Sequence, residues 1–210
     1  MNRIAIKVCG MRDSENIHRL AELNPDLMGF VFYPASARYA GEIPPEGMFE
    51  SFPPDILRTG VFVNDDLYSI KAYILRYRLQ AVQLHGNETE VLCENLKADG
   101  MKVIKAFSIG EHTDFSTMTR FVNCTDYFLF DTATKMAGGS GEKFNWDMLD
   151  TYKLEHPFFL SGGIGPGDAL KIRKLKHTAL AGVDINSRFE TEPGIKDIEK
   201  VKEFIRTIRG

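Results

Sequence analysis

A cysteine and an aspartate, far apart in the sequence, each end an apolar run. Cys9 ends the run that begins at Ile4, and Asp131 ends the run that begins at Tyr127. A Gly-led loop follows Cys9, and a Thr-led loop follows Asp131. In a barrel of parallel strands, catalytic groups collect at this edge. A thiol and a carboxyl placed there are suited to act as base and acid on one small substrate.

The alternation of side chains along a strand indicates which groups can meet. Lys7 and Cys9 lie on one side of the first strand, and Ile6 and Val8 lie on the other. If the aliphatic side chains pack against helices, Lys7 and Cys9 face the barrel interior. The ammonium of Lys7 can then stabilise the thiolate that a base requires. Considered by its position alone, Cys9 is slightly better explained as a small buried hydrophobic residue, as most free cysteines are.

The same alternation places further polar groups in the barrel. Asp131 faces inward on the sixth strand, and Gln83 and His85 face inward on the fourth. Lys105 is polar between two apolar neighbours on the fifth strand, and we count it with these groups. The apolar residues before Asp131 favour the raised pKa that a general acid needs, whereas the alternative is a carboxylate that caps the next loop. We expect a ligand at these strand ends rather than packing alone.

Two late segments together predict a phosphate site. Ser161-Gly162-Gly163-Ile164 follows the seventh apolar run, and Asn186-Ser187 follows the eighth. The loops after strands seven and eight of such barrels often bind phosphate, and glycines let backbone N–H groups approach an anion. A Gly-Gly pair alone is often merely a turn, so the prediction depends on both segments.

Arg38 lies in the loop that follows the second apolar run. Its guanidinium can bind a planar carboxylate through two parallel hydrogen bonds. The simpler interpretation is a solvated surface arginine.

Eight apolar, β-branched runs alternate with longer amphipathic stretches. We expect strands over residues 4–9, 27–32, 57–63, 81–85, 102–107, 127–131, 158–161 and 182–185. We expect helices over residues 14–23, 67–77, 88–98, 167–175 and 196–208. This alternation in 210 residues predicts an α/β fold, a single-domain (β/α)8 TIM barrel over residues 1–210. A doubly wound open sheet is the alternative, although it rarely needs eight strands in so few residues.

Helix caps and loops follow from the residue types between the runs. Asp13 or Ser14 is suited to cap the first helix, and Asp65 the next, because their side-chain oxygens accept from free backbone N–H groups. Residues 33–45 and 132–143 lack a helical pattern and follow strands, so we expect loops on the catalytic rim. The second is rich in glycine and small polar residues, and we expect it to be a mobile lid.

Composition and charge argue against several classes of function. The chain has 26% charged residues and a formal charge of −3, so it has no basic footprint for nucleic acid. No apolar run approaches the ~20 residues that span a membrane. The three cysteines and five histidines match neither a disulfide framework nor a metal-ligand pattern. We therefore expect free thiols, no metal and a reducing cytoplasm, and a monomer or a homodimer is compatible with the sequence.

The order of these segments resembles the phosphoribosylanthranilate isomerase family. The matching motifs run from residue 7 to residue 197, and their combination is specific although each alone is not. They are Lys7-Val8-Cys9-Gly10, Gly29-Phe30-Val31-Phe32 with Pro34, Ser36 and Arg38, Gly60-Val61-Phe62-Val63-Asn64, Gln83-Leu84-His85-Gly86, Asp131-Thr132 with Gly138-Gly139-Ser140-Gly141, Phe144-Asn145-Trp146, Leu160-Ser161-Gly162-Gly163-Ile164, Gly182-Val183-Asp184, Asn186-Ser187, Glu190, Pro193-Gly194 and Lys196-Asp197.

The resemblance implies an Amadori rearrangement without a cofactor, in which the phosphoribosyl amine of anthranilate becomes a 1-amino-1-deoxyribulose 5-phosphate. By motif position, Asp131 would protonate the furanose ring oxygen, and Cys9 would remove the C2′ proton of the resulting Schiff base. Arg38 would bind the anthranilate carboxylate. The phosphate would be bound largely by backbone N–H groups of Gly163, Asn186 and Ser187.

The chain departs from the family pattern at a few positions. After strand eight the family usually has two serines and a glycine, where this chain has Asn186-Ser187-Arg188. Arg188 in place of glycine is expected to alter the backbone there and the detailed phosphate contacts. Ser140 replaces a usual threonine and Asn145 a usual aspartate, and the fold should tolerate both. Cys9, Asp131 and Arg38, which the resemblance implies as base, acid and carboxylate-binding residue, are retained.

Three other functions are compatible with parts of the sequence. An epimerase-like barrel that acts on pentose phosphates would need metal-ligating His and Asp at strand ends, and that set is missing. A barrel like indole-glycerol-phosphate synthase would need further catalytic Lys and Glu residues, and Lys7 and Lys105 do not decide this. A barrel that only binds a sugar phosphate would be expected to lose Cys9 or Asp131, and both are present.

Overall fold

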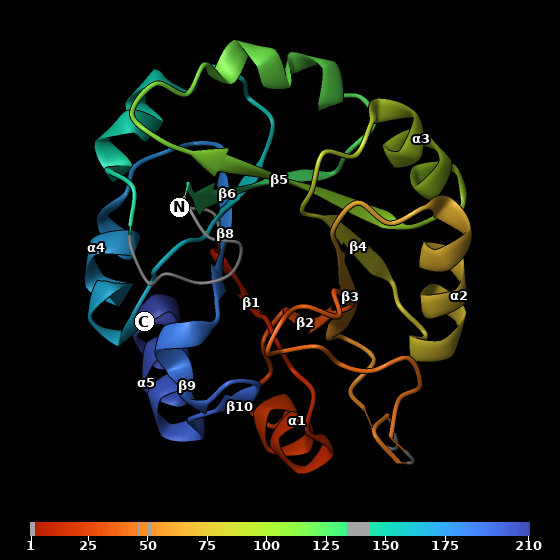
Figure 1. Ribbon diagram of the computed structural model, residues 1–210. Helices are drawn as coiled ribbons and strands as arrows, with labels where there is room; N and C mark the ends of the chain where they lie inside the picture. The colour runs from red at the N-terminus through yellow and green to blue at the C-terminus, as the bar shows by residue number, and fades with distance from the viewer. Residues whose placement is uncertain (1–2, 46, 50–51, 134–142) are drawn as a thin grey trace.

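Eight parallel strands close into a barrel, with helices around the outside (Figure 1). The computed structural model describes residues 3–45, 47–49, 52–133 and 143–210. Neighbouring strands pair in sequence order, and β8 (Leu180–Ile185) returns to pair with β1 (Ala5–Val8). Between them lie β2 (Leu27–Val31), β3 (Leu57–Phe62), β4 (Ala81–Leu84), β5 (Lys102–Ile109), β6 (Tyr127–Thr132) and β7 (Phe158–Leu160). All eight expected strands are confirmed, and the (β/α)8 TIM barrel with them.

The outer layer contains fewer α-helices than the barrel has strands. In the described part of the chain they are α1 (Ser14–Ala21), α2 (Leu67–Tyr77), α3 (Glu90–Ala98), α4 (Ala169–Lys174) and α5 (Ile198–Arg209). The expected helix over 167–175 begins as the 3₁₀ turn η3 (Pro166–Asp168) before α4. A short antiparallel pair that the sequence did not predict, β9 (Glu190–Glu192) and β10 (Ile195–Lys196), precedes α5.

Two connections carry 3₁₀ segments where the barrel pattern would place α-helices. After β5 lies η1 (Phe115–Phe121), and after β6 lies η2 (Trp146–Thr151). In η1 the buried residues Phe115, Met118 and Phe121 recur at every third position. That period matches the three residues per turn of a 3₁₀-helix and not the 3.6 of an α-helix.

One expected loop and one expected helix cap are confirmed, and another expected cap is wrong. Residues 33–45 form an irregular loop, as expected, whereas most of the expected loop 132–143 lies outside the described residues. Asp13 caps α1 by accepting from the backbone N–H of Asn16. The prediction that Asp65 caps α2 is wrong: Asp66 accepts from the backbone N–H of Ser69. Asp66 directly precedes the first helical residue, which is where a cap must lie.

Apolar side chains pack in two layers, one outside and one inside the barrel. Ile6 and Val8 belong to the outer layer beneath the helices, as the alternation predicted. The inner layer contains Leu27, Ile104, Ala106, Leu129 and Phe159. In the described part of the chain, no helix is long and apolar enough to cross a membrane.

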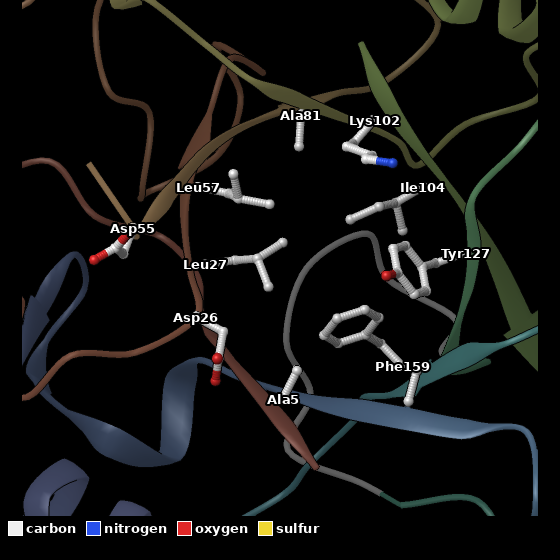
Figure 2. A pocket seen from close by; sticks show the side chains of 11 residues that line it. Ala5, Asp26, Leu27, Asp55, Leu57, Ala81, Lys102, Ile104, Tyr127 and Phe159 are labelled. Carbon is white, nitrogen blue, oxygen red and sulfur yellow. The ribbon is translucent and has the colours of Figure 1, made fainter. Parts of the chain in front are cut away.

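The N-terminal end of the barrel contains a cavity of about 350 Å³. Figure 2 shows Leu27, Leu57, Tyr127 and Phe159 pointing toward its centre, with Asp55 at the margin. Small side chains on other strands, such as Ala81, leave this space open. The inner apolar layer therefore separates this cavity from the polar groups at the opposite end of the barrel.

Candidate active site

An ion pair joins the first and last strands at the C-terminal end of the barrel. Lys7 Nζ donates to Asp184 Oδ1 at 2.8 Å, and Ser161 Oγ donates to Asp184 Oδ2 at 3.3 Å. Lys7 and Asp184 are partners in the β1–β8 ladder, so their side chains leave the sheet on the same face. Both side chains are buried, and each charge compensates the other where water is excluded.

Cys9 follows β1, and its side chain points toward β2. A Cβ atom on Gly29 would lie 2.7 Å from Cys9 Sγ and 3.2 Å from Lys7 Nζ, so the absent side chain leaves space for both groups. Burial raises the pKa of the Cys9 thiol, and the charge of Lys7 opposes this rise. Burial alone would lower the pKa of Lys7, but the charges of Asp184 and Cys9 raise it above its ordinary value. Lys7 therefore stays protonated beside Cys9, and its positive charge favours the thiolate.

Asp131 is connected to β4 through His85. Asp131 Oδ2 lies 3.3 Å from His85 Nε2, and Gln83 Nε2 lies 2.9 Å from His85 Nδ1. With the Gln83 amide as donor, Nδ1 accepts, and His85 carries its proton on Nε2, facing Asp131. The Asp131 and His85 side chains are each 31% exposed, so a ligand in the barrel mouth can reach both.

The thiol and the carboxyl stand apart across the mouth of the barrel. β1 and β6 are not neighbours, and in the described part of the chain no hydrogen bond or ion pair joins Cys9 to Asp131. A molecule that lies between them can contact the thiol on one side and the carboxyl on the other. That separation suits an acid and a base that act on different atoms of one substrate.

Lys105 does not belong to this site, and the expectation that it does is wrong. Its neighbours Ile104 and Ala106 fill the barrel interior, so Lys105 points outward. Its Nζ donates to the Gly86 carbonyl at 2.8 Å and to Glu88 Oε2 at 3.1 Å. The buried pair with Glu88 stabilises the loop that follows His85, which is a positioning task outside the barrel.

Arg38 is held at the rim and is not a solvated surface side chain. Its Nε donates to Glu190 Oε1 at 2.9 Å, and its Nη2 donates to Glu190 Oε2 at 2.6 Å. A Cβ atom on Gly10 would lie 2.7 Å from Arg38 Cδ, so the arginine passes directly over the residue that follows Cys9.

The two loops expected to bind phosphate lie beside the acid and beside Arg38. Gly162 and Gly163 have φ angles of 83° and 62°, which favour glycine. A Cβ atom on Gly162 would lie 2.9 Å from Asp131 Oδ1, so this turn adjoins the acid. Asn186 precedes the 3₁₀ turn η4 (Ser187–Phe189), and its Oδ1 would lie 2.7 Å from a Cβ on Gly10.

Arg188 lies within η4 without a positive φ, so the backbone at this turn accepts a residue other than glycine. Its Cδ would lie 3.2 Å from a Cβ on Gly165. The arginine therefore extends toward the loop after β7, from one of the two phosphate loops to the other.

The model of the N-(5′-phosphoribosyl)anthranilate (PRA) isomerase family matches residues 6–207 of the chain. The chain belongs to this family. An N-(5′-phosphoribosyl)anthranilate isomerase of Phocaeicola vulgatus is 44% identical over 97% of each chain. The crystal structure of phosphoribosyl anthranilate isomerase from Thermus thermophilus superposes with a TM-score of 0.85 at 25% identity, over 98% of each chain.

A further solved structure shows a PRA isomerase in complex with reduced 1-(o-carboxyphenylamino)-1-deoxyribulose 5-phosphate. It is 31% identical to this chain, with a TM-score of 0.80 over 99% of each chain. That ligand carries an aryl carboxylate at one end and a phosphate at the other. A PRA isomerase thus needs an anion site at each end of its substrate, with the reacting carbons between.

The alternation of side chains placed Lys7, Cys9, Gln83, His85 and Asp131 on the inner face, but it gave no role to three charged residues. Asp184 contacts Lys7, Glu190 contacts Arg38, and Lys196 contacts Glu190. Asp184 could have been found, because it lies next to the last residue of β8 and pairs with Lys7 across the ladder. Glu190 and Lys196 had only their place in the family motifs as a signal, since their contacts depend on the unpredicted β9–β10 pair.

Proposed function

We propose that the protein is an N-(5′-phosphoribosyl)anthranilate isomerase in tryptophan biosynthesis. It converts its substrate to 1-(o-carboxyphenylamino)-1-deoxyribulose 5-phosphate by an Amadori rearrangement without a cofactor. Membership of the PRA isomerase family supports the substrate. One observation carries the chemistry. The Cys9 thiol lies beside Lys7 and the Asp131 carboxyl lies beside His85, on opposite sides of one open barrel mouth.

The reaction begins at Asp131. Its carboxyl group donates a proton to the furanose ring oxygen, the bond from that oxygen to C1′ breaks, and the anthranilate nitrogen forms a Schiff base with C1′. His85 Nε2, 3.3 Å from Asp131 Oδ2, donates toward the carboxyl group and orients it for this proton transfer.

Cys9 then acts as the base. Its thiolate removes the C2′ proton, and the electron pair flows toward the positively charged nitrogen to give an enolamine. The enolamine becomes the ketone when the C2′ hydroxyl loses its proton and C1′ gains one. The Lys7 ammonium favours the thiolate form of the buried Cys9.

The two anionic ends of the substrate fix its orientation. Arg38 binds the anthranilate carboxylate beside the end of β1. The phosphate is bound by the loops after β7 and β8, with contributions from Gly162, Gly163, Asn186 and Ser187. The positive φ angles of the two glycines and the position of Asn186 beside Gly10 support this arrangement.

The test follows the fluorescence of freshly made phosphoribosylanthranilate. The wild-type protein is expected to remove the signal far faster than spontaneous hydrolysis. Cys9→Ser and Asp131→Asn should each lower kcat by a factor on the order of 10²–10⁴, with KM changed by less than about threefold.

Two matched variants serve as controls: Cys93→Ala, within α3, and Asp147→Asn, on the exposed side of η2. Both should turn over substrate like the wild type. Wild-type turnover in Cys9→Ser or Asp131→Asn would reject the roles, and a wild-type rate equal to spontaneous hydrolysis would reject the function.

We also infer one barrel domain over residues 1–210, acting as a monomer or a homodimer in a reducing cytoplasm. The three cysteines are free and buried, which supports a reducing compartment. Light scattering after gel filtration distinguishes the two oligomeric states.

A further inference from the structure

A buried cluster of three charges stands behind the proposed carboxylate site. Glu190, at the start of β9, accepts three hydrogen bonds from Arg38, at 2.9 Å and 3.1 Å from Nε and 2.6 Å from Nη2. The Glu190 side chain is 5% exposed, and the Arg38 side chain is 16% exposed. The Arg38 guanidinium is therefore fixed in the plane of a buried carboxylate.

The contacts leave one edge of the guanidinium available. A guanidinium can pair with a carboxylate through its Nε–Nη2 edge or through its Nη1–Nη2 edge. Glu190 takes the Nε–Nη2 edge, and in the described part of the chain Nη1 makes no hydrogen bond. A second planar carboxylate can bind to the remaining edge without displacing Glu190.

Lys196 supplies the charge that this arrangement requires. Its Nζ donates to Glu190 Oε1 at 2.6 Å and to Asn186 Oδ1 at 2.8 Å, and its side chain is fully buried. Arg38 and Glu190 alone would form a neutral pair with little attraction for an anion. Burial lowers the pKa of Lys196, and the charge of Glu190 opposes this fall. With Lys196 protonated, the cluster carries one net positive charge in a site of low dielectric, where it acts strongly on a carboxylate.

Lys196 is itself held in place by the backbone. Asn16 of α1 donates from Nδ2 to the Lys196 carbonyl and accepts at Oδ1 from the Lys196 N–H, each at 2.8 Å. Figure 1 shows β9 and β10 next to α1 and α5. Burial raises the pKa of Glu190, but Arg38 and Lys196 outweigh this and hold it below its ordinary value, so the carboxylate stays ionised.

We propose that Glu190 is a positioning residue that aims the free edge of Arg38 at the aryl carboxylate of the substrate, and that Lys196 keeps the cluster positively charged. This inference rests on the proposed function, because it requires a substrate with a carboxylate. A purely structural role for Glu190 is the competing explanation, since its Oε1 also accepts from the Gly194 N–H in the β9–β10 turn.

The experiment compares two substrates that differ by one carboxylate. Glu190→Gln keeps the shape of the side chain but removes its charge. For N-(5′-phosphoribosyl)anthranilate, KM should rise roughly tenfold with kcat changed by less than about threefold. The guanidinium is no longer fixed, and this loss should outweigh the added positive charge, so that ground-state and transition-state binding weaken together. For N-(5′-phosphoribosyl)aniline, followed by chromatography of the ketose product, KM should not change.

Three further proteins complete the design. In an Arg38→Met background, Glu190→Gln should add no further rise in KM. Glu192→Gln, the same change on an exposed residue of the same strand, should behave like the wild type. If Glu190→Gln does not fold, Glu190→Asp takes its place. This variant keeps the charge but moves the carboxylate away from Arg38, so KM should rise by a smaller factor and only for the anthranilate substrate.

The outcomes separate the two proposals. An equal rise in KM for both substrates, or a rise that persists in Arg38→Met, overturns the positioning role and leaves the isomerase function intact. A wild-type protein that does not convert phosphoribosylanthranilate overturns the function itself and the positioning role with it.

Discussion

At the scale of single residues, the proposed base depends on a balance of two charges. Burial raises the pKa of Cys9, Lys7 lowers it, and Asp184 raises it again. Asp184 also holds the Lys7 ammonium in place at 2.8 Å. The Asp184 carboxylate therefore has two opposite effects on Cys9. It positions the Lys7 ammonium that favours the thiolate, and its own negative charge partly cancels the effect of that ammonium.

This balance predicts the effect of Asp184→Asn. Removing the negative charge leaves the thiolate as the main counter-ion of Lys7, so the pKa of Cys9 should fall. The acid limb of kcat/KM should move to lower pH by the same amount. Thiolate absorbance near 240 nm, with Cys9→Ser as the blank, measures the pKa directly.

The thiols of Cys93 and Cys124 should not contribute to the absorbance change in this titration. Burial raises the pKa of Cys93 to about 12, and burial also raises the pKa of Cys124. Asp55→Asn, at the opposite end of the barrel, is the control and should leave the titration unchanged. A Cys9 pKa that rises in Asp184→Asn would show that Asp184 acts mainly by holding Lys7.

At the scale of elements, β2 contributes to the site through Gly29, which has no side chain. Gly29 has ordinary strand geometry, so its role is spatial and not conformational. The space above it contains Cys9 Sγ and Lys7 Nζ. The strand therefore limits where the thiol can lie.

Gly29→Ala should lower kcat by about a hundredfold, because the added methyl group would lie 2.7 Å from Cys9 Sγ and must displace it. The stability cost should be about 1–3 kcal/mol, typical of overpacking, as measured by urea denaturation. Gly167→Ala is the control, since no atom lies within 4 Å of the added Cβ. Normal turnover in Gly29→Ala would mean that the thiol can move without loss of function.

The elements also show where sequence reasoning succeeds and where it stops. Alternation identified the strands and the inward side chains of Lys7 and Cys9, because one periodic rule covers a whole strand. It was misapplied to Lys105, which shares no face with Ile104 and whose partner Glu88 lies beyond β4. The contacts of Glu190 with Arg38 join residues 152 positions apart, and no local pattern encodes them.

At the scale of the whole molecule, function and stability occupy opposite ends of the barrel. The polar site lies where the strands end, and the cavity lined by Phe159 and Tyr127 lies where they begin (Figure 2). The rings of Phe159 and Tyr127 meet edge to face, with centroids 5.3 Å apart. Phe158, the preceding residue, points outward and is packed against the rings of Phe130, Tyr152 and His177.

This difference predicts unequal costs for two adjacent substitutions. Phe158→Ala should destabilise the protein by about 4–5 kcal/mol, because it creates an enclosed void among packed rings. Phe159→Ala should cost about 3 kcal/mol, because it enlarges a space that already exists. Urea denaturation measures both, and kcat of Phe159→Ala should equal the wild-type value well below its unfolding transition. An equal or larger cost for Phe159→Ala would contradict this account.

The pairing of Lys7 with Asp184 has a consequence for the order in which the chain is synthesised. β1 leaves the ribosome first and β8 last among the barrel strands, so a nascent chain exposes Cys9 long before Asp184 exists. Until β8 docks, the thiol has neither its buried surroundings nor a fixed ammonium beside it. Turnover therefore requires β8 and the residues of the site that follow it, such as Asn186 and Glu190, and activity reports that translation of the barrel is complete.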